Sequence, residues 1–144
     1  MERASELGMP ALALTDHGTM FGVIDFYRAA KSAGIKPILG MEAYLAARGM
    51  RDRDPQLDAR SFHQLLLAEN DTGYRNLLQL ASAAQLEGFY YRPRIDHDFL
   101  AAHSDGLIVT TGCLSGEIPR ALADGRTEHA QRLVDWYFEV FGPD

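Results

Sequence analysis

The apolar positions of this chain fall into blocks that alternate between two spacings. Four blocks are short, nearly continuous apolar runs, which are typical of strands covered on both faces. These are residues 10–15, 35–46, 62–69 and 106–112. Other blocks repeat apolar residues every three or four positions, which predicts helices over residues 2–8, 20–33, 72–85 and 127–142. Strands that alternate with helices predict a parallel sheet with right-handed crossovers.

The remaining segments predict shorter elements. A short helix is expected over 97–103 and another over 115–125, the second broken near Pro119. Either Asp71 or Thr72 is predicted to cap the helix at 72–85.

The segments outside the helices bear on the overall fold. Residues 48–60 are charged and predict an exposed loop, and residues 88–96 are aromatic and extended. Four strands are too few to close a barrel, and an eight-unit barrel needs at least about 200 residues. The chain is therefore predicted to be an open α/β sheet or a piece of a barrel.

Composition narrows the function classes. Apolar residues make up 47% of the chain, enough for a core, which argues against a disordered chain. The net charge of −6 argues against a protein that binds nucleic acid through a basic face of its own. Cys113 is the single cysteine, so no internal disulfide forms, which fits a cytoplasmic setting. No apolar run is long enough to predict a membrane span.

Polar residues with metal-ligand chemistry follow or interrupt the predicted strands. In parallel α/β folds the active site gathers where strands end, and Asp16-His17 and Cys113 occupy such positions. Glu42 interrupts the second apolar run, and His63 begins the third, where the strand-end rule predicts no site residue. Two imidazoles, a carboxylate and a thiol are the ligand types of zinc, manganese and iron. The pattern alone is as consistent with a metal site as with separate structural roles for these residues.

Simpler interpretations of single residues stay open. A histidine at a strand end often caps a turn, and a cysteine before a helix often packs as a small buried group. Glu42 is harder to dismiss because an unpaired buried carboxylate is costly. Three further histidines have polar neighbours and are predicted to be solvated surface groups: His97, His103 and His129.

Several blocks of the chain together resemble one known family. "LGMPALALTDHGTMFGVIDFYRAAKSAGIKPILGMEAYLA", "FHQLLLAENDTGYRNLLQLASAAQLEGFYYRPRID" and "GLIVTTGCLSGEIPRAL" closely resemble the PHP (polymerase and histidinol phosphatase) domain of bacterial DNA polymerase III alpha subunits. The resemblance implies an incomplete (β/α) barrel of the seven-unit PHP type. Residues 1–144 are then expected to be a partial PHP domain that lacks the first strand and the closing strands.

The resemblance also implies a ligand set. It assigns His17, Glu42, His63 and Cys113 as ligands of zinc or manganese, with Asp16 orienting the imidazole of His17.

Two arginines of "YYRPRID" follow the aromatic residues of this block. Arg92 and Arg94 are candidates for a phosphate contact near the barrel mouth, and the simpler alternative is that they pair with surface acids.

The family implies a role for the parent protein. It would be a DNA-directed DNA polymerase, a nucleotidyltransferase of chromosome replication that uses Mg²⁺, with a metal-dependent 3′–5′ exonuclease activity or a stabilising role for the PHP part. Its implied partners are DNA, the sliding clamp, and the proofreading and clamp-loader subunits. The fragment alone is expected to be inactive. The alternatives are a stand-alone PHP phosphoesterase resembling histidinol phosphatase, and a non-enzymatic scaffold.

Overall fold

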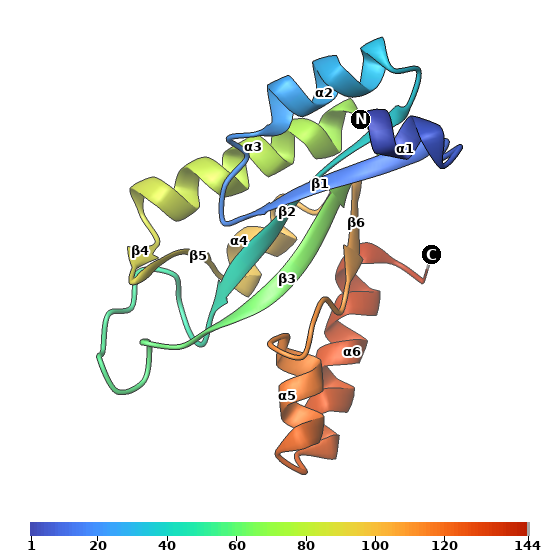
Figure 1. The fold of residues 1–144 in the computed structure, drawn as a ribbon. Coiled ribbons are helices and arrows are strands. Elements are labelled where there is room, and N and C mark those ends of the chain that lie inside the picture. The colour runs from blue at the N-terminus through green and yellow to red at the C-terminus, as the bar shows by residue number, and fades with distance from the viewer. Residues whose placement is uncertain (144) are drawn as a thin grey trace.

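The computed structural model describes residues 1–143 as a mixed α/β fold built around one long strand, β2 (Figure 1). The elements are, in order, α1 (Glu2–Glu6), β1 (Ala11–His17), α2 (Val23–Ser32), β2 (Lys36–Ala46), β3 (Ser61–Ala68), α3 (Asp71–Leu86), β4 (Phe89–Tyr90), β5 (Arg92–Ile95), α4 (His97–Ala101), β6 (Leu107–Thr110), α5 (Glu117–Ala123) and α6 (Thr127–Phe141). The predicted elements are all present, with ends shifted by a few residues.

Strand β2 organises the sheet. Along one edge it pairs in parallel first with β1 and then, near its end, with β5. Its other edge pairs with β3, which runs antiparallel, and β3 in turn pairs antiparallel with β6. The purely parallel sheet expected from the alternating pattern is therefore wrong. Residues 47–60 form no helix that could carry the chain across the sheet, so β3 returns directly alongside β2.

The sheet does not close. Within residues 1–143, β6 pairs with β3 alone, and β4 ends the other side of the sheet. The predicted incomplete barrel is confirmed as an unclosed, mixed sheet. Helices α5 and α6 form an antiparallel pair beside β6 (Figure 1).

One face of the sheet carries the core. Met41 and Leu45 of β2 and Leu66 of β3 pack against α3 and α4, whose contributions include Leu77 and Leu100. Because successive strand residues point to opposite faces, the residues between them face away from these helices. The face opposite the helices therefore receives Glu42 and Tyr44 from β2 and His63 from β3.

Two helix ends differ from the sequence predictions. Asn70 caps α3, since its side chain accepts a hydrogen bond from the Gly73 amide at 3.1 Å, so the cap is neither Asp71 nor Thr72. Pro119 does not break α5, because it lies in the first turn, where a backbone N–H has no partner within the helix.

No helix within residues 1–143 has both the length and the apolar character that are needed to cross a membrane.

Candidate metal centre

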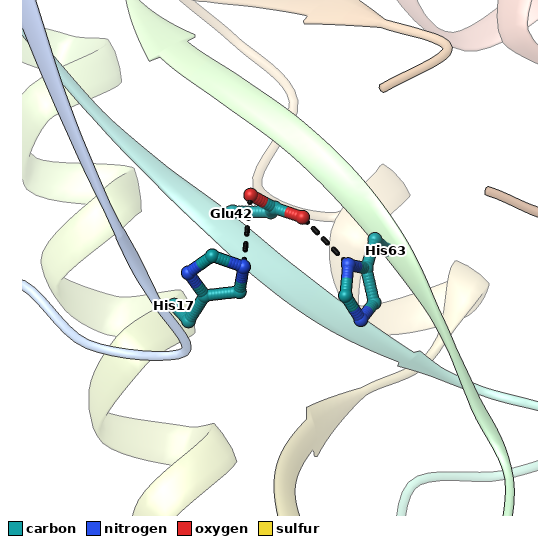
Figure 2. Close-up of side chains that lie close together, drawn as sticks. All are labelled: His17, Glu42 and His63. Atoms are coloured by element: carbon teal, nitrogen blue, oxygen red, sulfur yellow. Dashed lines mark hydrogen bonds and ion pairs between the residues drawn. The ribbon is translucent and has the colours of Figure 1, made fainter. Parts of the chain in front are cut away.

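Three side chains converge on the face of the sheet opposite α3 and α4 (Figure 2). Glu42 lies between two histidines: its Oε2 is 3.1 Å from Nε2 of His17, and its Oε1 is 2.6 Å from Nδ1 of His63. One ligand atom of each residue lies within 4.8 Å of those of the other two. This is a compact set of two imidazoles and one carboxylate.

Strand register explains the convergence. His17, the last residue of β1, stands opposite Glu42 in the parallel β1–β2 pair. His63 stands opposite Tyr44 in the antiparallel β2–β3 pair, two residues beyond Glu42 on the same face. An antiparallel strand begins where its parallel neighbours end. The position of His63 at a strand start, unexplained by the sequence rule, thus puts it at the same end of the sheet as His17.

The cluster is partly open to solvent. The side chain of His17 is 58% exposed, whereas those of Glu42 and His63 are 21% and 26% exposed. The carboxylate is thus held in place by the strands, and the more exposed imidazole faces the solvent. An ion or a substrate has access from the His17 side.

Tyr44 completes the wall of the site. Its ring lies edge-on to that of His63, with centroids 5.2 Å apart, and 6.3 Å from the ring of His17. Sequence reasoning missed this residue, although its place two residues after Glu42 in a strand puts it on the same face.

Cys113 lies beside this cluster. Its Sγ is 3.6 Å from Nδ1 of His63 and accepts a hydrogen bond from the Ser115 amide at 3.3 Å. It is exposed and comes from the loop after β6. The structure therefore brings Cys113 to one side of His63, next to the three-residue set rather than within it.

Asp16 occupies a different place from the predicted one. Its Oδ2 accepts a hydrogen bond from the Gly22 amide at 3.0 Å, which closes the turn between β1 and α2. Neighbouring strand residues point to opposite faces, so Asp16 points away from the side of β1 that carries His17. Within residues 1–143 no hydrogen bond joins Asp16 to His17.

The two candidate phosphate-binding arginines have different environments. Arg94 is only 1% exposed and donates hydrogen bonds to backbone carbonyls of Gly88, Met50, Asp52 and Asp58. Its guanidinium therefore anchors the loop before β3 and is not free for a phosphate.

Arg92 remains available. Its side chain is exposed, and its guanidinium carbon lies 5.7 Å from the centroid of the Tyr44 ring. That ring also contacts His63, so a positive charge stands close to the histidine–glutamate cluster.

A second polar cluster was not anticipated. His97 is not a solvated surface group, because its Nε2 is 2.8 Å from Oε1 of Glu117 and its ring packs edge-on against Trp136. Burial acts to lower the pKa of His97, but the hydrogen bond and charge of Glu117 outweigh it, so the pKa is raised from its ordinary value of 6.5. No sequence signal joins these residues, which lie 20 positions apart on different helices.

Comparison with known proteins identifies the fold family. The model of the PHP domain matches residues 1–144, and the chain belongs to the PHP domain family. It is 49% identical to the DNA polymerase III subunit alpha of Borreliella burgdorferi, 48% identical to that of Thermus aquaticus and 45% identical to that of Treponema pallidum. These alignments cover 100%, 92% and 98% of this chain but 13%, 11% and 12% of the relatives. The chain thus spans about an eighth of the length of the relatives it matches.

Proposed function

We propose that this chain is a metal-binding part of the PHP domain of a bacterial DNA polymerase III subunit alpha. The observation that carries the proposal is the convergence of His17, Glu42 and His63 from three strands onto one point. In this proposal the domain either hydrolyses phosphodiesters from the 3′ end of DNA, as in proofreading, or stabilises the polymerase.

The donor set suits the ions that the proposal names. Two imidazole nitrogens and a carboxylate are ligands of zinc, and manganese accepts the same groups. His17, Glu42 and His63 would hold the ion, with the Cys113 thiol as a further donor beside His63. When bound, a zinc or manganese ion polarises a phosphate oxygen and lowers the pKa of a water molecule.

The residues of the chain have separate tasks around that point. Glu42 supplies the negative charge that balances a cation, and in the metal-free chain its two oxygens hold both imidazoles in place. His17 is the solvent-facing donor. Arg92, held over Tyr44, supplies positive charge to a phosphate that approaches the cluster.

The wider role follows from the relatives. The three relatives reported above are all named DNA polymerase III subunit alpha, which favours this role over the stand-alone phosphoesterase. DNA synthesis with Mg²⁺, a cytoplasmic location, and association with DNA, the sliding clamp, and the proofreading and clamp-loader subunits belong to the proposal for the longer protein. The proposal assigns no polymerisation to these 144 residues, so its test is metal binding.

The test is metal content per chain after loading with zinc or manganese and dialysis against metal-free buffer. The unsubstituted chain is expected to keep about one ion, and His17→Ala and Glu42→Gln are expected to lose it. His129→Ala is the matched control, since His129 lies on α6, away from the three strands. A chain that keeps no ion, or variants that keep it fully, would contradict the proposal.

A further inference from the structure

The loop that carries Cys113 is tied to strand β3 at both of its ends. This Cys113 loop comprises residues 111–116, between β6 and α5. Just before it, the carbonyl of Thr110 accepts a hydrogen bond from Nε2 of Gln64. Within it, the carbonyl of Ser115 accepts one from the His63 amide at 3.1 Å. Gln64 and His63 are neighbours on β3, so these two hydrogen bonds fix the position of the loop relative to the strand that carries the candidate ligand His63.

A tyrosine from α6 connects the end of the loop to β3. The hydroxyl of Tyr137 is 2.6 Å from Oε1 of Gln64 and 2.6 Å from Oε1 of Glu117, the first residue of α5. The side chain of Tyr137 thus connects Glu117, where the loop ends, to Gln64 on β3. Thr110 at the entrance and Glu117 at the exit are both linked to the same glutamine.

Burial makes the loss of any of these hydrogen bonds costly. Gln64 is 2% exposed and Glu117 is 7% exposed, so a lost partner leaves a polar atom without water. His97 adds a second contact to the same oxygen of Glu117, at 2.8 Å. Among residues 1–143 no buried side-chain nitrogen or oxygen lacks a partner.

The proton of Tyr137 is held firmly. Burial, together with the charge and hydrogen bond of Glu117, raises the pKa of Tyr137 well above its usual range, so the hydroxyl stays a donor. A phenol has one proton, so it can donate to only one of these two oxygens at a time, and the charged carboxylate of Glu117 is the stronger acceptor. The hydroxyl of Tyr137 therefore donates chiefly to Glu117 and lies against Oε1 of Gln64 at 2.6 Å.

We propose that Gln64, Tyr137 and Glu117 form a positioning network that holds the Cys113 thiol against His63, so that the thiol joins the metal ligands. This inference rests on the metal-binding function proposed above. The three residues do not touch the ion. Gln64 points to the opposite face of β3 from His63, and Tyr137 and Glu117 belong to helices beyond it.

The test compares Tyr137→Phe with the unsubstituted chain, and Tyr27→Phe is the matched control because Tyr27 lies on α2 and is exposed. Two readouts report on Cys113. The first is the nuclear Overhauser cross-peak between the Cys113 methylene and the His63 ring, measured without metal. The second is the thiolate-to-cobalt charge-transfer band on titration with Co²⁺ alone, which reports one thiol because Cys113 is the only cysteine.

The expected result is that Tyr137→Phe loses the cross-peak, loses most of the thiolate band and binds cobalt roughly tenfold more weakly, as outer-shell changes at metal sites do. The histidine-dependent visible bands should persist, and Tyr27→Phe should match the unsubstituted chain. An unchanged cross-peak and band in a cooperatively folded Tyr137→Phe overturn the inference.

The design separates the two proposals. If the unsubstituted chain binds no cobalt, the metal-binding function fails, and the metal-free cross-peak still decides whether the network positions Cys113. If Tyr137→Phe does not fold, Glu117→Gln replaces it, since it keeps an acceptor for Tyr137 but removes the charge. A weakened cross-peak in Glu117→Gln supports the network, and an unchanged one counts against it.

Discussion

Glu42 and His63 are 21 residues apart in the chain, yet their side chains meet at 2.6 Å across the antiparallel pair of β2 and β3. The same carboxylate reaches His17 on the other side, so one residue of the central strand connects three strands. Replacement of this carboxylate is therefore the most direct way to separate the proposed metal binding from the stability of the fold.

Glu42→Gln should abolish stabilisation by metal while leaving the metal-free chain folded. The amide retains the size of the side chain but removes the charge that balances a cation. For the unsubstituted chain, zinc at about 100 times its dissociation constant should raise the free energy of unfolding by about 2.7 kcal/mol. Denaturant unfolding with and without zinc measures both proteins, and an equal gain in Glu42→Gln would rule out this carboxylate as a ligand.

Arg94 and Arg92 should differ sharply in their contribution to stability. Arg94→Met leaves the carbonyls of Met50, Asp52 and Asp58 without their donor and should lower the free energy of unfolding by about 3 kcal/mol. Arg92→Met, at an exposed position two residues away, should change it by less than about 0.5 kcal/mol. Urea unfolding of both variants provides the measurement, and similar losses would contradict the structural role of Arg94.

The ion pair of His97 and Glu117 should stabilise the fold in acid and lose that effect in base. The pKa of His97 is raised in the folded chain above 6.5, so folding favours the protonated ring. The contribution is complete below the unfolded value and is lost as the pH rises through the folded value.

The measurement for this pair is the free energy of unfolding of the unsubstituted chain and of His97→Gln at about pH 5.5 and about pH 9. The difference between the two proteins should be larger at the acidic pH. A difference that grows toward basic pH would show that His97 is not stabilised as the imidazolium.

The side chain of Asn70 should stabilise helix α3 more than that of Thr72 does. Asn70→Ala removes the oxygen that accepts from the Gly73 amide and should cost about 1 kcal/mol of stability. Thr72→Ala is the control, because Thr72 is the second residue of α3. It should lower the stability by less than half of that amount. Thermal unfolding of the two variants decides between them, and the reverse order would reassign the cap.

The local hydrophobic pattern predicts the helices and strands of this chain, but it does not predict the direction in which β3 runs. The apolar run at 62–69 predicts a strand whichever way it runs, and its pairing partner is set by the loop before it. That direction determines whether His63 lies near His17 or at the far end of the sheet. The residue types of the candidate centre were therefore readable from sequence, and its geometry depended on one non-local pairing.

Charged residues show the same limit. Arg94 lies in an exposed-looking block, "YYRPRID", yet it is buried because carbonyls from a distant loop surround it. His97 has acidic neighbours in the sequence, yet its partner Glu117 comes from another helix. Both environments arise from contacts between segments that are far apart in the chain. Residue propensities and local hydrophobic patterns describe only neighbouring positions, so they do not predict such contacts.

The order in which donors occur along the chain has a consequence for synthesis. His17, Glu42 and His63 lie on β1, β2 and β3, which are consecutive strands that pair with one another. Cys113 follows His63 by 50 residues, after α3, α4 and β6. As the chain leaves the ribosome, the imidazoles and the carboxylate can meet before the thiol has been made. An ion captured early would then be held by nitrogen and oxygen first, and sulfur would join only after the second half of the chain has folded around it.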